Sequence, residues 1–163
     1  MILKILLSGD GGQGIQLIAD MICRVSFEAG WHVTSIPNYG LEQRGGVSLN
    51  FIQISDKKIV YPKFSKPDVL LIMSSQARER TEEYQKDSKD IKILDIKEIE
   101  DNLKKNNVSM QSYNVFCLGM ITKILEEKNI CKKEDVFTLI EKKLSTKLGW
   151  EENKRVWGFS ILN

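Results

Sequence analysis

The feature that most constrains the fold is a glycine-rich turn near the amino terminus, Gly9-Asp10-Gly11-Gly12-Gln13-Gly14. A near-continuous apolar run, residues 2–8, precedes the turn. A segment with apolar side chains at helical spacing, residues 14–29, follows it. A strand, a tight glycine turn and a helix in this order are typical of a Rossmann-like start, because glycines let the backbone turn sharply between the two elements. The sequence therefore predicts a buried first strand and a helix that packs on its sheet.

The rest of the chain alternates between short apolar runs and amphipathic segments. We expect further strands at residues 31–36, 47–55, 69–73, 91–94 and 108–110, and residues 59–60 as a hairpin partner of 47–55. We expect helices after Ser74 or Ser75, after Asp95, and over residues 114–128 and 133–148, the last two closing the chain. This alternation predicts a single three-layer α/β/α domain over residues 1–163, with a mostly parallel sheet and room for an antiparallel segment near 47–60. The first strand, first helix and second strand should form a compact right-handed βαβ unit.

Charge and composition exclude several function classes. The 163 residues carry 24 basic and 22 acidic side chains, a net charge of +2, so there is no concentrated basic field for nucleic acid. The apolar amino-terminal run is too short to cross a membrane and lacks the features of a signal peptide, so we expect a cytoplasmic protein. The cysteines, Cys23, Cys117 and Cys131, form no CxxC pair. We therefore expect free thiols in a reducing compartment rather than a disulfide framework or a metal centre.

Two interpretations of the glycine turn stay open. Its backbone N–H groups and the start of the following helix could bind an anionic group such as a phosphate. The turn could equally be a tight connection with no ligand. A dinucleotide site is disfavoured, since the second predicted strand ends at residues 34–38 without the acidic side chain that would bind a ribose.

A second polar loop, residues 38–46, contains Tyr39-Gly40 and Arg44-Gly45-Gly46. Arg44 is a candidate to bind a carboxylate, a phosphate or a partner subunit; alternatively, it braces its own loop through backbone carbonyls. In a parallel sheet the loops at residues 8–13, 37–46 and 74–76 should gather at one rim, where open α/β sheets bind ligands. No catalytic residue is assigned, because the only histidine, His32, lies in a predicted strand without a nucleophile partner.

These two motifs carry a resemblance to a known family. With the motif pair Gly9–Gly14 and Arg44-Gly45-Gly46, the chain resembles the gamma subunits, or gamma domains, of pyruvate/2-oxoacid:ferredoxin oxidoreductases, including the smaller subunit of indolepyruvate oxidoreductase. The resemblance extends to the turn with Tyr61-Pro62, to Pro67-Asp68 before an apolar run, and to Asn114 with Leu118-Gly119. Leu41 and Gln43 depart from the common pattern of that family, and the resemblance implies no particular 2-oxo acid.

The resemblance implies an accessory subunit of an enzyme that oxidatively decarboxylates a 2-oxo acid, usually with coenzyme A as cosubstrate. It implies that thiamine diphosphate, Mg²⁺ and iron–sulfur clusters are held by other subunits and that none of them is bound by this chain alone. The implied partners are alpha and beta subunits, with delta in some complexes, and a ferredoxin-like acceptor. Coenzyme A is a further candidate ligand, and a homodimer is expected for the isolated chain.

The expected role is assembly and access to the active site rather than redox chemistry. Two alternatives stay open: a stand-alone nucleotide-binding protein of the NAD or FAD type, and a non-enzymatic interaction module on the same scaffold. The candidate ligand- or partner-binding residues are Gly9, Asp10, Gly11, Gly12, Gln13, Gly14, Tyr39, Gly40, Arg44, Gly45 and Gly46.

Overall fold

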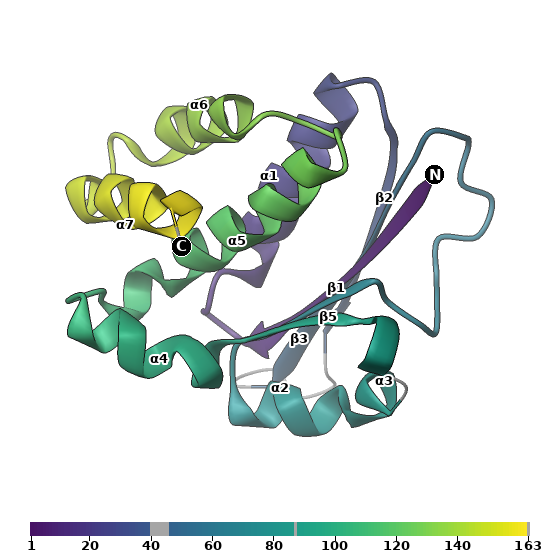
Figure 1. Ribbon diagram of the computed structural model, residues 1–163, viewed down its shortest axis with the longest axis horizontal. Helices are drawn as coiled ribbons and strands as arrows, with labels where there is room; N and C mark the ends of the chain where they lie inside the picture. Colours follow the sequence, from purple (N-terminus) through teal and green to yellow (C-terminus); the bar gives the residue numbers. More distant parts are fainter. Residues whose placement is uncertain (40–45, 87, 163) are drawn as a thin grey trace.

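The computed structural model describes residues 1–39, 46–86 and 88–162, which form one five-stranded sheet of order β2-β3-β1-β4-β5 flanked by helices (Figure 1). The strands are β1 (Ile2–Asp10), β2 (His32–Tyr39), β3 (Val47–Ser55), β4 (Val69–Ile72) and β5 (Lys92–Asp95). The α-helices are α1 (Ile15–Glu28), α2 (Ser75–Arg80), α3 (Glu82–Gln85), α4 (Ile96–Lys105), α5 (Tyr113–Glu127), α6 (Lys133–Leu144) and α7 (Trp150–Leu162). Two short 3-10 helices are Ser88–Asp90 and Met110–Ser112.

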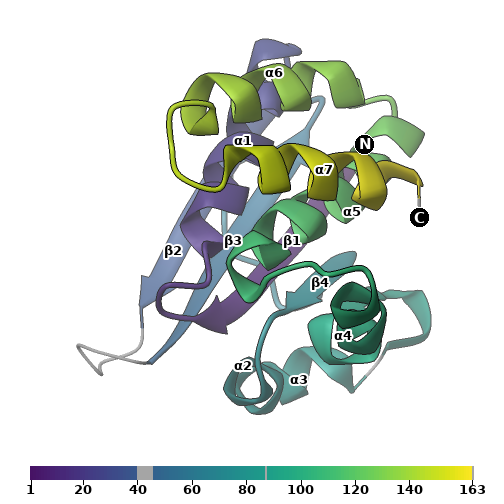
Figure 2. The ribbon, with the colours of Figure 1, turned by 90° about the vertical axis from the view of Figure 1, so that its left-hand side faces the viewer.

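The predicted α/β fold with an antiparallel segment is confirmed, and β3 is that segment. It runs antiparallel to both of its neighbours, β1 and β2, whereas β4 is parallel to β1 and β5 is parallel to β4. The compact unit expected from β1, α1 and β2 is corrected in one respect, because β3 lies between β1 and β2 (Figure 2). Strand β3 pairs with β1 from Ile2↔Ser55 to Asp10↔Val47 and with β2 on its other side, so it is an interior strand, while β1 is the central one.

Two short strand predictions are wrong. Residues 59–60 lie in the connection between β3 and β4, where the Val60 side chain is 77% exposed and no sheet neighbour covers it. Residues 108–110 instead lead from the end of α4 into the 3-10 helix that begins at Met110, and the Val108 amide donates to the Leu103 carbonyl. Strand propensity in so short a run is outweighed by the tertiary context, which gives the segment no partner.

The two faces of the sheet are covered unequally. We call the face with Leu3, Ile5 and Leu7 the helix face; α1 and α5 pack on it, and α6 and α7 lie outside them (Figure 1). We call the opposite face the strap face, after the strap, residues 56–68, which connects β3 to β4. The side chains of Leu6, Phe51 and Leu70 form a smaller cluster there with Ala77 of α2. The three-layer prediction holds, but the third layer is thin.

Two closing helices were expected and the chain has three, since α7 follows α6 after Gly149, whose φ is +86°. Charged side chains interrupt the apolar positions of α7, so its periodicity is weak in the sequence. Close contact explains why α5 carries Gly119: a Cβ there would lie 1.8 Å from the Ser160 Oγ of α7. Over the described ranges, none of the helices has the length and apolar character needed to cross a membrane.

Candidate functional site

The candidate site lies at the rim of the sheet where β1 and β4 end and β3 begins. The Gly11 amide donates to the Gly46 carbonyl over 3.2 Å, so the glycine turn meets the last residue of the second glycine motif. On the other side, the Ser74 hydroxyl donates to Asp10 Oδ1 over 2.7 Å and accepts from the Ala77 amide. The sequence prediction that these three loops gather at one rim is therefore correct for their described residues.

The side chain of Gln13 holds the turn in place. Its Oε1 accepts from the Asp10 amide over 2.7 Å, and its Nε2 donates to the Met73 carbonyl at the end of β4 over 2.9 Å. A Cβ at Gly9 would lie 2.8 Å from Gln13 Oε1, so the turn closes tightly around this amide. The Gln13 side chain thus has a structural role, because it joins the turn to the end of β4. The Asp10 carboxylate also has a structural role, because it accepts the hydrogen bond from Ser74.

Backbone amides remain available on the outer side of the turn. Among the described residues, the amides of Gly12 and Gly14 have no hydrogen-bond partner, and Gly12 is exposed. Both glycines have positive φ, +92° and +84°, a conformation that side-chain-bearing residues rarely adopt. Because α1 begins at Ile15, these amides lie at the positive end of its helix dipole. The arrangement suits a phosphate, a carboxylate or a carbonyl oxygen of a partner.

The sequence did not show that Asn114 belongs to this region. A Cβ at Gly14 would lie 2.3 Å from Asn114 Nδ2, so the third glycine of the motif makes room for the start of α5. Two residues separated by about a hundred positions in the chain thus meet at the rim, and α1 and α5 begin next to each other there. The family resemblance includes the glycine turn and Asn114 as separate features, and neither indicates that they are in contact.

A polar network supports the first turn of α1 from the helix face of the sheet. The Gln16 side chain accepts from Asn50 Nδ2 over 3.0 Å and donates to the Ser48 hydroxyl over 3.3 Å. The Ser35 hydroxyl of β2 donates to Asn50 Oδ1 over 2.8 Å. Since Asn50 is only 1% exposed, these bonds fix α1 to β2 and β3 directly below the rim.

The described residues include only part of the predicted site. Gly9, Asp10, Gly11, Gly12, Gln13, Gly14 and Gly46 form the rim, while Tyr39 contributes the last backbone position of β2, paired with Ser48. Gly40, Arg44 and Gly45 lie outside the described residues, so the prediction for Arg44 stays a prediction. A dinucleotide site is further disfavoured by the topology, because β3 separates the end of β2 from the glycine turn.

The thiols do not fit the ligand set of an iron–sulfur cluster. Burial raises the pKa of Cys117 to about 12; it likewise raises that of Cys131 to about 12 and that of Cys23 to about 11. The cluster ligand is the thiolate, which these environments disfavour. All three cysteines are free, and no three His, Cys, Asp or Glu side chains in the described part of the chain are grouped to hold a metal ion.

Comparisons with known proteins agree with this architecture. The sequence model of one family, described as pyruvate ferredoxin/flavodoxin oxidoreductase, matches residues 4–91. A 2-oxoglutarate synthase subunit, KorC, of Methanothermobacter marburgensis is 40% identical over 75 residues, which span 45% of this chain and 40% of the relative. The chain therefore covers less than half the length of that relative.

Solved structures match the fold over nearly the whole chain. The keto/oxoacid ferredoxin oxidoreductase gamma subunit of Geobacter sulfurreducens has a TM-score of 0.70 at 21% identity, covering 98% of this chain and 96% of that one. A chain of the 2-oxoglutarate:ferredoxin oxidoreductase of Magnetococcus marinus, with 2-oxoglutarate, coenzyme A and succinyl-CoA bound, has a TM-score of 0.76 at 19% identity. It covers 99% of this chain and 30% of that one. At these identities the likeness establishes the fold.

Proposed function

The chain belongs to the pyruvate ferredoxin/flavodoxin oxidoreductase family, and on that premise we propose that it is the gamma subunit of a multi-subunit 2-oxoacid:ferredoxin oxidoreductase. In this proposal it helps to assemble the complex and shapes access to the active site, while other subunits carry the redox chemistry. One observation carries the proposal: the two glycine motifs of the family-matched region meet at one rim, through the Gly11–Gly46 hydrogen bond.

The chemistry of the rim supports a binding role. The turn offers backbone donors at Gly12 and Gly14, while the Asp10 and Gln13 side chains are occupied by protein contacts. Such a surface can hold an anionic group of coenzyme A or a carbonyl of a partner subunit, and the Asp10 carboxylate among its described residues is bonded to Ser74 rather than free to act as a general base. We therefore assign the rim to binding and positioning, together with Tyr39, Gly40, Arg44 and Gly45 of the second loop.

The proposal places the cofactors elsewhere in the complex. Thiamine diphosphate with Mg²⁺ would be held between the alpha and beta subunits, and iron–sulfur clusters by the beta and delta subunits. The buried, protonated thiols of this chain give it no ligand set for a cluster. The holoenzyme would decarboxylate a 2-oxo acid, transfer the acyl group to coenzyme A and pass two electrons to ferredoxin or a similar acceptor.

Reconstitution tests this role. We would co-express the chain with the alpha and beta subunits encoded in its own genome, and measure co-purification and the 2-oxo acid-dependent reduction of ferredoxin. The matched variants are Gly11→Leu, at an exposed rim position where an added Cβ would lie 3.9 Å from the Gly46 carbonyl oxygen, and Gly158→Ala, on α7 away from the rim. We expect the complex to form with wild type and Gly158→Ala, and Gly11→Leu to lower turnover by about tenfold, as lost positioning typically does.

Reconstitution, together with a nucleotide titration, separates the competing functions. Turnover by the chain without other subunits, or tight binding of NAD or FAD in a calorimetric titration, would favour a stand-alone enzyme. A chain that binds neither nucleotides nor the alpha and beta subunits would be an interaction module of another kind.

A further inference from the structure

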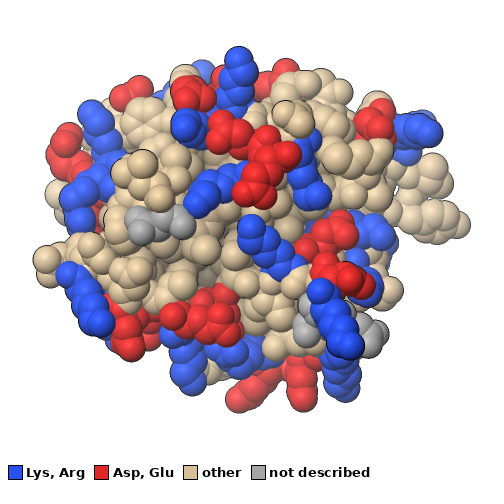
Figure 3. Space-filling view, in the orientation of Figure 1, with Lys and Arg blue, Asp and Glu red and all other residues tan. Residues whose placement is uncertain are grey.

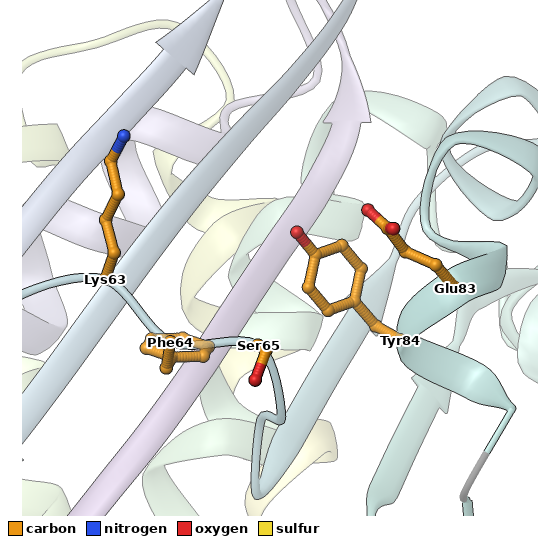
Figure 4. A pocket seen from close by; sticks show the side chains of 5 residues that line it. All are labelled: Lys63, Phe64, Ser65, Glu83 and Tyr84. Carbon is orange, nitrogen blue, oxygen red and sulfur yellow. The ribbon is translucent and has the colours of Figure 1, made fainter.

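A second surface feature, a pair of hollows, lies beside the strap, near the start of β1 and away from the rim. The two hollows adjoin on the strap face, with volumes of about 520 and 400 Å³. Both are lined by Lys63, Phe64 and Ser65, and the larger one reaches Glu83 and Tyr84 of α3 (Figure 4). We call the two hollows together the strap groove. Its β1 residues are Ile2 and Lys4, and Lys4 lies about 20 Å along the strand from the rim residue Asp10.

The base of the groove is formed by side chains packed between the sheet, the strap and α3. The Phe51 ring of β3 makes edge-on contacts with Phe64 of the strap and Tyr84 of α3, at centroid distances of 5.3 and 6.0 Å. The Gln53 side chain, 2% exposed, donates its Nε2 to the Tyr61 carbonyl over 2.7 Å. These contacts hold the strap against the sheet, so the surface it presents is ordered before any partner binds.

Large apolar side chains project from this surface. Tyr61 and Val60 are 82% and 77% exposed, and Ile2, which lines the same hollow, is 46% exposed. The strap forms the right-hand edge of the molecule in Figure 1, and uncharged side chains protrude there in the same view in Figure 3. A cluster of exposed aliphatic and aromatic groups marks an interaction surface, whereas singly scattered ones do not.

The charge around these apolar groups is positive. Four lysines line the smaller hollow: Lys4, Lys58, Lys63 and Lys66. Of these, Lys66 has an ion-pair partner, Asp90 at 3.5 Å, and the other three have none among the described residues. The neighbouring Asp56 carboxylate is occupied by the amino-terminal ammonium group, 2.6 Å away. Elsewhere on the face shown in Figure 3, acidic and basic side chains are interspersed.

We propose that the strap groove is the docking surface for a partner subunit of the oxidoreductase, one that presents carboxylates around an apolar patch; this rests on the proposed function. The partner would match the groove in two ways. Its apolar patch would cover Val60 and Tyr61, and its carboxylates would pair with the lysines. A second copy of this chain does not fit, because a two-fold contact would bring the same lysines face to face. A small anion alone would leave the projecting side chains in water.

The test uses purified alpha and beta subunits and measures their Kd for the full chain at low and high salt. One variant removes the apolar contact, Val60→Ser with Tyr61→Ser, and a second reverses charge, Lys58→Glu with Lys63→Glu. The matched control is Leu148→Ser, since that side chain is fully exposed in the connection between α6 and α7. Thermal unfolding of each variant checks that it is folded.

We expect both groove variants to raise the Kd by about tenfold or more, as loss of interface anchors does. The control should stay within about twofold, and the charge-reversed variant should lose most of the salt dependence. Equal binding by all variants would overturn this docking surface and leave the proposed function standing. Weakening by charge reversal alone would overturn it in favour of an anionic ligand. If wild type does not bind the subunits, the proposed function fails and this inference falls with it.

Discussion

The helix face and the strap face of the same sheet differ in how deeply their side chains are buried. On the helix face, β-strand side chains such as Ile5 and Ile52 are fully buried beneath α1 and α5, and the cluster continues into α4, α6 and α7. On the strap face a small cluster is completed by half-buried side chains such as Phe64 and Tyr84. We infer that most of the folding free energy comes from the helix face, which leaves the strap face free to present a binding surface.

One carboxylate on the helix side differs from the groove lysines in its ion pairs. On the helix side, Asp20 of α1 pairs with Arg24 and with Lys143 of α6. Partial burial alone would raise the pKa of Asp20, but hydrogen bonds from Lys143 and Arg24 outweigh it and lower that pKa. Three lysines of the strap groove have no such partner within the described ranges. The Asp20 pairs thus join two helices of the fold, whereas these three groove lysines keep their charge available to a partner.

We expect the largest difference when one apolar side chain on each face is truncated to alanine and the free energies of unfolding are compared. Ile52→Ala removes a fully buried side chain and should lower the free energy of unfolding by about 4 kcal/mol, since the surrounding core cannot close the cavity. Phe64→Ala on the strap should cost about 1.5 kcal/mol, because that ring is only half-buried. Urea unfolding followed by circular dichroism measures both. Equal losses would show that the strap face contributes as much as the helix face.

Close helix packing gives the next largest effect. Gly119→Ala should destabilise the protein by about 3 kcal/mol, because its Cβ would overlap Ser160 of α7. Gly158→Ala, also in a helix but with open space around it, should instead stabilise by about 0.8 kcal/mol. Adding Ser160→Gly to Gly119→Ala should restore part of the loss. A neutral Gly119→Ala would mean that α7 does not pack on α5 in solution.

The buried thiol of Cys117 adds a smaller, pH-dependent effect on the helix face. Burial raises its pKa to about 12 in the folded state from 9.0, so the unfolded chain ionises first. Stability from this group is therefore complete below pH 9 and falls as the pH rises towards 12, by about 1.4 kcal/mol for each pH unit. Unfolding of wild type and Cys117→Ala at pH 8 and pH 10 measures the difference. A parallel decline in both proteins would contradict the prediction.

Sequence reasoning succeeded where the signal is local. The β1–turn–α1 start follows from an apolar run, glycines and a helical repeat that lie within thirty residues, and the structure agrees. The helix caps were also predictable: Ser74 accepts from the Ala77 amide and Asp95 from the Lys97 amide. The rim was predictable as a place, because strands that run in the same direction end at the same edge.

Non-local pairing was not predictable in the same way. Nothing within residues 47–55 indicates that β3 inserts between β1 and β2, because the same alternating pattern would suit an edge strand. The contact between Gly14 and Asn114 and the close approach of α7 to Gly119 depend on how the helices pack after the sheet has formed. The strap groove likewise combines Lys4 of β1, Gln53 of β3 and Lys63 of the strap.

By itself, the sequence determined the fold class, the first strand–turn–helix unit and the edge of the sheet at which the loops meet, because backbone preference and hydrophobic periodicity act over a few residues. Only the tertiary structure decided that β3 lies between β1 and β2 and which face of the sheet is left partly open. The physical reason is that burial depends on the sum of contacts from distant segments, and no single segment encodes that sum.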